Sequence, residues 1–222
     1  MNQLTCQAVI FDLDGVLVDS TIVVEGTWRR WAAVHDLNFE RVMQVAHGRP
    51  ARDTVRLFAP HLDAEAEAAR LAAEEAHQTD GLVRIEGAVQ LINSLPKSRW
   101  AVVTSGTRGI ATTRLTFASV TIPAVLITAD DVERGKPDPQ AYTLAAERLG
   151  VPPESCIVIE DAPAGIQGAR AAGMSVIAVA TTHPREALQD ADVIVGCLVD
   201  IRASADAGCI AIFVGGDHAA VD

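Results

Sequence analysis

The sequence lacks any apolar run long enough to cross a membrane. Its longest apolar stretches stop well short of the ~18 residues that a transmembrane helix needs. The chain also does not open with basic residues followed by an apolar stretch, so we expect no secretory signal. Internal repeats and low-complexity tracts are missing as well. With 222 residues, 49% of them apolar, the chain has enough material for a core domain and a smaller module.

Cysteine and positive charge are scarce. The four cysteines, Cys6, Cys156, Cys197 and Cys209, show no CxxC spacing, which favours small buried apolar side chains in a reducing cytoplasm. A net charge of −11 argues against nucleic-acid binding through a broad basic face. An anionic small molecule is still allowed, because a local lysine and a divalent cation can reverse the charge inside one pocket. We therefore expect a cytoplasmic protein with neither a nucleic-acid nor a membrane partner, of unknown oligomeric state.

Two carboxylates follow the first apolar strand, one residue apart. Residues 8–15 read Ala-Val-Ile-Phe-Asp-Leu-Asp-Gly, a short apolar run that is typical of a buried parallel strand. Asp12 and Asp14 then lie at its carboxyl end, and Gly15 allows a sharp turn. Two carboxylates in one pocket repel each other unless a cation lies between them. A plain strand with an Asp-Gly turn would have the same sequence, so the remaining motifs decide.

Three later segments supply a phosphate cradle, a lysine and a second acidic pair, in that order. Trp100–Gly106 is an apolar strand that ends in hydroxyl side chains and a glycine. Gly135–Pro139 places a lysine in a rigid turn just before a helix. Cys156–Ala162 is an apolar strand that ends in adjacent carboxylates. All these polar groups follow strands, where a parallel sheet would bring them together.

Strand and helix patterns alternate in residues 1–16 and 84–222. Further elements are expected as strands at Val125–Thr128, Ser175–Val179 and Val193–Val195, and as helices at Ala88–Leu95, Gly109–Thr116, Pro139–Leu149, Ala164–Ala172 and Pro184–Gln189. The alternation predicts an α/β fold with a doubly wound, Rossmann-like parallel sheet. Residues 197–222 have no readable pattern apart from a possible extra edge strand at Cys209–Val214.

Residues 17–83 have a different pattern. Trp28, Trp31 and Ala32 recur at helical spacing, and Asp63–His77 is rich in alanine, glutamate and arginine. No strand pattern lies between these two stretches. We expect an inserted all-α cap domain, placed after the first strand where it could cover the site.

Together, these motifs resemble the haloacid dehalogenase (HAD) superfamily of phosphohydrolases. The resemblance runs from about Val9 to about Thr182. Within the superfamily, Ala101–Thr107, Ile127–Val132 and Glu160–Gly165 are most similar to glycerol-phosphate and 2-deoxyglucose-6-phosphate (sugar-phosphate) phosphatases. The resemblance implies a helical cap over the α/β core and Mg²⁺-dependent hydrolysis of a small sugar or polyol phosphate through an aspartyl-phosphate.

Three residues are the expected catalytic groups. Asp12 is the nucleophile, since positioning and neutralised phosphate charge make carboxylate attack on phosphorus feasible. Asp14 is the general acid that protonates the leaving alkoxide, and afterwards the base that activates water. Lys136 is expected to pair with both Asp12 and the phosphate.

The metal is expected among four acidic residues. Asp161 would coordinate Mg²⁺ directly, and Glu160 either directly or through water. The resemblance implies that Asp12 and the backbone carbonyl of Asp14 complete the set. In the alternative, Glu160 and Asp161 only cap the helix that follows.

The phosphate and the rest of the substrate have separate candidates. Thr104 and the backbone amides of Ser105 and Gly106 are expected to hold the phosphoryl oxygens. Arg49, in the His-Gly-Arg-Pro segment at 47–50, resembles a substrate-facing residue, although a surface pair with Asp53 is equally compatible with the sequence.

Two other functions fit parts of the pattern. A β-phosphoglucomutase-like phosphomutase would usually carry a histidine four residues beyond the position of Ser20, where this chain has Val24 followed by Glu25. A phospho-accepting signalling module would also combine Asp, a hydroxyl, Lys and Mg²⁺, but it would be shorter and would have no helical insertion. Within the phosphatase class, phosphoglycolate and pyrophosphate remain possible substrates.

Overall fold

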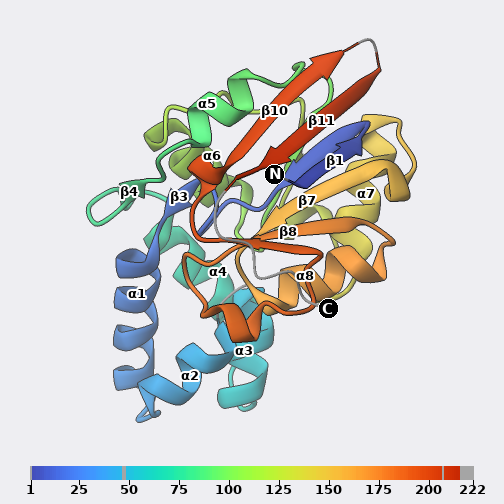
Figure 1. Ribbon diagram of the computed structural model, residues 1–222. Coiled ribbons are helices and arrows are strands. Elements are labelled where there is room, and N and C mark those ends of the chain that lie inside the picture. The colour runs from blue at the N-terminus through green and yellow to red at the C-terminus, as the bar shows by residue number, and fades with distance from the viewer. Residues whose placement is uncertain (1, 47–48, 207, 216–222) are drawn as a thin grey trace.

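A six-stranded parallel sheet forms the centre of the computed structural model, which describes residues 2–46, 49–206 and 208–215 (Figure 1). The strands lie in the order β6-β5-β2-β7-β8-β9. Their bounds are β2 Ala8–Phe11, β5 Trp100–Val103, β6 Val125–Ile127, β7 Cys156–Glu160, β8 Ser175–Val179 and β9 Val193–Val195. Every residue of β2, β5 and β7 is buried, as expected for strands covered on both faces. The predicted α/β doubly wound fold is confirmed.

Helices cover both faces of this sheet. On one face, Val9 and Phe11 of β2 belong to the core that includes α5 (Ala88–Asn93) and α6 (Arg108–Phe117). On the other, Ala8 and Ile10 pack with α7 (Gln140–Leu149) and α8 (Pro163–Ala171). The period-two alternation of one strand therefore divides its side chains between two cores.

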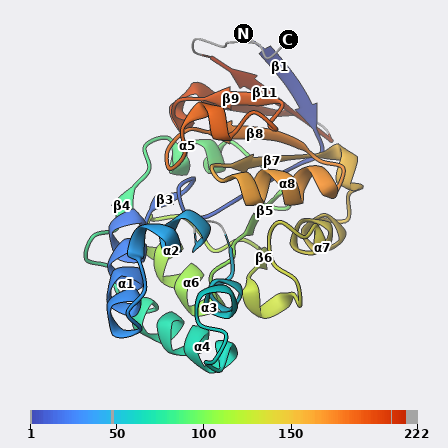
Figure 2. The ribbon, with the colours of Figure 1, turned by 90° about the horizontal axis from the view of Figure 1, so that it is seen from below.

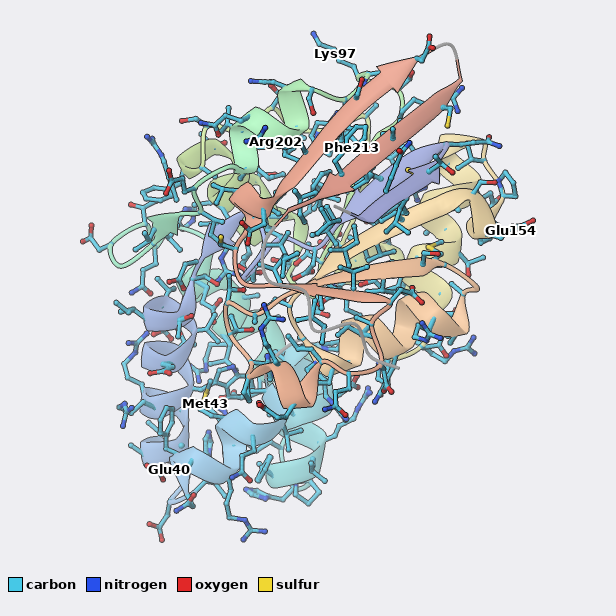
Figure 3. All side chains as sticks on the ribbon, viewed as in Figure 1. Glu40, Met43, Lys97, Glu154, Arg202 and Phe213 are labelled. Atoms are coloured by element: carbon cyan, nitrogen blue, oxygen red, sulfur yellow. The ribbon has the colours of Figure 1, made fainter. Side chains whose placement is uncertain are left out.

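A second sheet was not foreseen. Strands β1 (Asn2–Cys6), β11 (Cys209–Val214) and β10 (Ile201–Asp206) form an antiparallel sheet in that order. The prediction of a strand at Cys209–Val214 is confirmed, but its placement at an edge is wrong because β1 pairs along its other side. The buried residues Ile210, Ile212 and Val214 alternate toward the core, whereas the intervening side chains, such as Phe213, are less buried (Figure 3).

The chain between β2 and β5 is mainly helical. Helices α1 (Thr21–Val34), α2 (Phe39–Ala46), α3 (Ala51–Phe58) and α4 (Ala64–Glu75) have a hydrophobic core of their own, which includes Trp31, Val42 and Val55. They gather at the opposite end of the molecule from the three-stranded sheet (Figures 1 and 2). The prediction of an all-α insertion is wrong at both ends of the segment, where β3 (Val18–Asp19) and β4 (Val83–Arg84) pair antiparallel.

Two smaller predictions are also corrected. The helix expected at Pro184–Gln189 is a single 3₁₀ turn at Arg185–Ala187, since a segment of this length gains too few hydrogen bonds to propagate. Cys6 and Cys156 are buried as predicted, but Cys197 and Cys209 are exposed. Cys197 directly precedes a 3₁₀ turn at Leu198–Asp200, and Cys209 lies at the hairpin end of β11. Among the described residues, no helix is long and apolar enough to span a membrane.

Candidate active site

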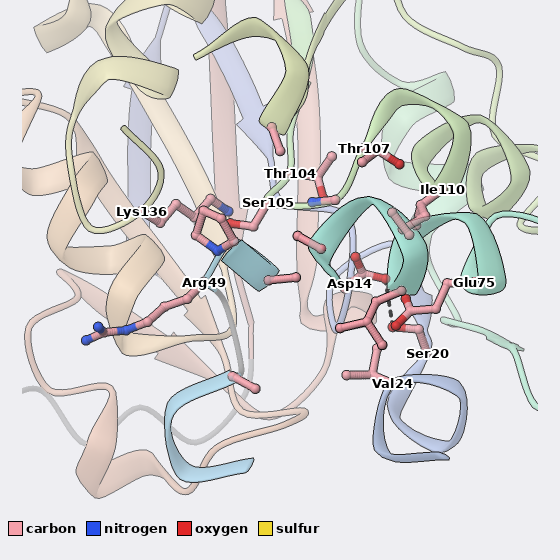
Figure 4. A pocket seen from close by; sticks show the side chains of 18 of the residues that line it. Asp14, Ser20, Val24, Arg49, Glu75, Thr104, Ser105, Thr107, Ile110 and Lys136 are labelled. Atoms are coloured by element: carbon pink, nitrogen blue, oxygen red, sulfur yellow. Dashed lines mark hydrogen bonds between the residues drawn. The ribbon is translucent and has the colours of Figure 1, made fainter. Parts of the chain in front are cut away.

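A pocket of about 270 Å³ lies where the carboxyl ends of β2, β5 and β7 face helices α1–α4 (Figure 4). The sheet side contributes Asp12, Asp14, Thr104, Lys136 and Asp161 to its lining. The helical side is largely apolar, with Val24, Trp28, Ala46, Ala51, Ala68, Ala69, Leu71 and Ala72. The structure thus brings the sequence-predicted groups of the core into one pocket, as the rule for open parallel sheets leads us to expect, except for Glu160, which does not line it.

Lys136 is buried on the sheet side of the pocket and contacts several of its polar groups. Its Nζ lies 2.6 Å from Asp12 Oδ1 and 2.7 Å from Glu160 Oε1, and it donates to the carbonyl of Val103 at 3.3 Å. Burial acts to lower the pKa of Lys136, but the charges of Asp12 and Glu160 outweigh it and raise that pKa well above its usual range. The lysine therefore remains a cation beside Asp12.

Glu160 has donors on both of its carboxylate oxygens. Oε1 accepts from Lys136 Nζ and from the Tyr142 hydroxyl at 2.9 Å, and Oε2 accepts from the backbone amides of Asp161 and Ala162 at 2.8 and 2.9 Å. A Cβ at Gly165 would lie 1.6 Å from Oε1, so only glycine at this point of α8 leaves room for the carboxylate. Glu160 thus orients the lysine and holds the start of α8, an arrangement that leaves it poorly suited to direct metal coordination.

Asp12 and Asp161 fit a cation better. One carboxylate oxygen from each of Asp12, Glu160 and Asp161 lies within 4.8 Å of the others, and all three residues are buried. Burial raises the pKa of Asp12 to about 7 despite the opposing pull of Lys136. Burial, followed by the charges of Glu160 and Asp12, raises the pKa of Asp161 well above its usual range. A divalent cation between these carboxylates would relieve both desolvation and repulsion.

The turn after β2 is shaped around Asp161. Gly15 has a positive φ of 82°, and a Cβ there would lie 2.0 Å from Asp161 Oδ2. The same oxygen accepts a hydrogen bond from the Thr182 hydroxyl. The glycine that the sequence analysis placed in a sharp turn is therefore also needed to let Asp161 approach Asp12.

Asp14 is held by two residues, Ser20 and Arg114, neither of which the sequence analysis identified as its partner. Its Oδ1 accepts from the Ser20 hydroxyl at 2.7 Å and lies 2.8 Å from Arg114 Nη1. Arg114 also pairs with Glu75, with 2.8 Å between Nη2 and Oε2. The sequence did contain a sign of this role for Arg114, because its spacing from Ile110 places a charged residue on the apolar, buried face of α6. For Glu75, one of several glutamates near the end of α4, there was none.

The phosphate-cradle residues follow β5 directly. Thr104 is buried, and its Oγ1 accepts from the backbone amide of Gly106 at 3.0 Å. Thr104, Ser105 and Gly106 all line the pocket, and α6 begins two residues later. This places the segment at a helix N-terminus, where backbone N–H groups favour an anion.

Arg49 also lines the pocket but is exposed. Its side chain extends away from Asp14 and Glu75 (Figure 4). Asp53, the alternative partner suggested by the sequence, pairs instead with Arg56 at 3.2 Å. His47 and Gly48 of the same motif lie outside the described residues.

Comparison with known proteins agrees with this arrangement. The haloacid dehalogenase-like hydrolase family matches residues 6–173. Hexitol phosphatase A of Escherichia coli is 41% identical over 201 residues, covering 88% of this chain and 93% of that protein. Glycerol-1-phosphate phosphohydrolase 2 of Saccharomyces cerevisiae is 35% identical over 199 residues, covering 84% and 80%.

A solved structure shows the same architecture. A hydrolase from Pseudomonas syringae superimposes with a TM-score of 0.75 at 25% identity, covering 87% of this chain and 94% of that one. The resemblance inferred from the four motifs is confirmed over most of the chain. With its Asp12–Lys136 pair, acidic cluster and matched sequence, the chain belongs to the haloacid dehalogenase-like hydrolases.

Proposed function

We propose that the protein is a Mg²⁺-dependent phosphatase that hydrolyses small sugar or polyol phosphates through an aspartyl-phosphate. The observation that carries this proposal is the buried pair of Asp12 and Lys136, with 2.6 Å between its charged atoms. The opposite wall of their pocket combines small and apolar side chains with a few charged ones, among them Arg49. The hexitol and glycerol phosphatases similar to this chain support the substrate class.

In this reaction Asp12 attacks the phosphorus atom in line with the leaving alkoxide. Lys136 neutralises charge on the nucleophile and the phosphoryl group, and Glu160 fixes its ammonium in place. Thr104 and the start of α6 hold the phosphoryl oxygens. Water then attacks the aspartyl-phosphate, which restores Asp12 and releases phosphate.

Asp14 supplies proton transfer. It protonates the leaving oxygen in the first step and accepts a proton from water in the second. Its partly exposed carboxylate lines the pocket beside Asp12, as this role requires. Ser20 and Arg114 hold one of its oxygens.

Mg²⁺ would be held by Asp12, Asp161 and the backbone carbonyl of Asp14. Its chemistry is to neutralise phosphoryl charge and to orient the phosphate, and carboxylates with a phosphate oxygen are the ligands it prefers. Glu160 belongs outside this set, because its oxygens already accept four hydrogen bonds. The proposed role of Glu160 is to hold the ammonium group of Lys136 in place.

We further propose that residues 17–83 form a cap domain on a core made of 1–16 and 84–222. The separate hydrophobic core of α1–α4 and the small apolar side chains on the pocket wall support this division. A cap in this place excludes water and selects the substrate. Arg49, on the pocket rim, is the candidate for contacting substrate hydroxyls or phosphate.

Hydrolysis is favoured over phosphoryl transfer to a sugar. A mutase needs a cap group that moves a proton to or from the acceptor hydroxyl, and the pocket has Val24 at the position expected for it (Figure 4). Water is therefore the acceptor we propose. A pocket large enough for a small-molecule substrate argues against a purely phospho-accepting signalling role.

The acidic chain and its free cysteines fit a cytoplasmic enzyme. The net charge of −11 disfavours nucleic-acid partners. All four cysteines are free, two of them exposed, which suits a reducing compartment. The small-molecule phosphate ester is the proposed partner.

The test is phosphate release from hexitol phosphate, glycerol phosphate, phosphoglycolate, pyrophosphate and glucose 1-phosphate, with Mg²⁺ and with EDTA. We expect the polyol and sugar phosphates to be hydrolysed best, and only with the metal. Formation of glucose 6-phosphate faster than phosphate release, with a bisphosphate primer present, would contradict hydrolysis. Mass spectrometry of acid-quenched enzyme checks for a phosphoryl group on Asp12.

A further inference from the structure

Arg114 is a buried cation that joins two carboxylates from distant parts of the chain. Its side chain is 6% exposed, and its two terminal nitrogens lie 2.8 Å from Asp14 and 2.8 Å from Glu75. Asp14 follows β2, whereas Glu75 is the last residue of α4 (Figure 4). The planar fork of a guanidinium fixes the positions of two acceptors at once, which a lysine cannot do.

The Glu75 end of this bridge is firmly seated. The Thr113 hydroxyl on α6 donates to the carbonyl of Ala76 at 2.6 Å. Gly109, also on α6, lies close to Ala76, since a Cβ at this glycine would be in van der Waals contact with the Ala76 Cβ at 3.6 Å. The end of α4 is therefore attached to the same helix that carries Arg114, and Glu75 restrains the guanidinium through the terminal nitrogen that does not contact Asp14.

A general acid works only if its carboxyl lies within hydrogen-bond reach of the leaving oxygen, so small displacements are costly. Asp14 is partly exposed and would have several rotamers open to it without the contacts at Oδ1. We propose that Arg114 is a positioning residue for Asp14, and that Glu75 is its anchor on α4. The inference rests on the phosphatase function and the proton-transfer role of Asp14 proposed above.

Leaving-group dependence tests this role. p-Nitrophenolate departs without a proton, whereas the alkoxide of glycerol phosphate needs one. With Arg114→Met we expect kcat on glycerol phosphate to fall about 100-fold, the lower end of the ~10²–10⁴ that general acid–base catalysis contributes. On p-nitrophenyl phosphate we expect a loss below about tenfold, with KM for both substrates nearly unchanged.

Two conservative variants sharpen the test. Arg114→Lys keeps the charge but reaches one carboxylate at a time, so it should recover part of the alkyl-phosphate activity. Glu75→Gln weakens the anchor and should show the same selective loss at about tenfold or less. The matched controls are Glu74→Gln, whose glutamate pairs with Arg30 and Arg70 and does not line the pocket, and Arg170→Met, which removes an ion pair of α8 with Asp192. Both controls should leave the ratio of the two activities at its wild-type value.

Equal losses on both substrates in Arg114→Met, in protein that melts like wild type, would overturn the positioning role and leave the phosphatase function standing. If Arg114→Met does not fold, the ratio in Glu75→Gln and Arg114→Lys decides, and an unchanged ratio in both overturns the inference. A wild-type enzyme that hydrolyses neither substrate would overturn the proposed function and this inference together.

Discussion

The two walls of the pocket are built differently. On the sheet side, Asp12, Lys136, Glu160 and Asp161 are buried polar groups linked by hydrogen bonds and ion pairs. The helical side is lined mostly by small or apolar side chains, and Arg49 is exposed on it. The contrast indicates that the sheet side fixes the chemistry and the helical side limits which substrate fits. Changes on the sheet side should therefore affect every substrate alike, whereas changes on the helical side should separate large from small substrates.

The largest effect is expected at the nucleophile. Asp12→Asn removes the attacking carboxylate, so kcat should fall by about 1,000-fold or more on every substrate, a loss of about 4 kcal/mol of transition-state stabilisation. Phosphate release measures it, and Asp190→Asn, at an exposed position, is the control. Retention of more than about a tenth of the wild-type kcat would exclude Asp12 as the nucleophile.

Activity should depend nearly as strongly on Gly165, which leaves room for the Glu160 carboxylate on the sheet side. Alanine normally stabilises a helix by about 1 kcal/mol relative to glycine. In Gly165→Ala the new Cβ would lie 1.6 Å from Glu160 Oε1 and displace the carboxylate that holds Lys136. We expect a net destabilisation of about 1–3 kcal/mol, as for overpacked cores, and a loss of kcat shared by all substrates. Gly196→Ala, with nothing within 4 Å of its Cβ, is the matched control for urea unfolding and turnover.

A more selective effect is expected on the helical wall. Ala72→Leu narrows the pocket and leaves the polar groups unchanged. We expect kcat/KM for hexitol phosphate to fall about tenfold, the lower end of the effect that one methylene has on substrate discrimination in a hydrophobic pocket. Glycerol phosphate should be affected much less. Ala73→Leu changes the neighbouring exposed residue, which does not line the pocket, and serves as control. Equal losses for the two substrates would show that this wall does not select by size.

The smallest effect is expected at Asp63, which stabilises the helical segment but does not itself line the pocket. The Asp63 carboxylate caps α4 by accepting from the amides of Glu65 and Ala66, both at 3.1 Å. Asp63→Ala should lower the free energy of unfolding by about 1 kcal/mol, with kcat unchanged on both substrates. Urea titration and steady-state kinetics check it. A marked change in substrate preference would mean that the position of α4 is set by its N-terminus as well as by its contacts with α6.

The sequence by itself determined the central sheet and the position of its polar residues. Short apolar runs such as Ala8–Phe11 and Cys156–Glu160, bounded by turn residues, are typical of covered parallel strands, and the residues that end such strands meet at one edge of the sheet. Strand patterns and turn residues can be recognised from neighbouring residues alone. For this reason the sequence was enough to predict that Asp12, Lys136 and Asp161 lie close together. The helix in residues 63–77 could likewise be predicted from the composition of that segment alone.

Only the tertiary structure decided which partners these residues have. Glu160 reads as a possible metal ligand in sequence, yet Lys136 and Tyr142 occupy one of its oxygens and two backbone amides the other. The link from Arg114 to Glu75 joins positions 39 residues apart, and β11 became a central strand because β1, from the opposite end of the chain, pairs with it. Periodicity records which side of an element is buried, but it carries no information about which distant segment covers that side.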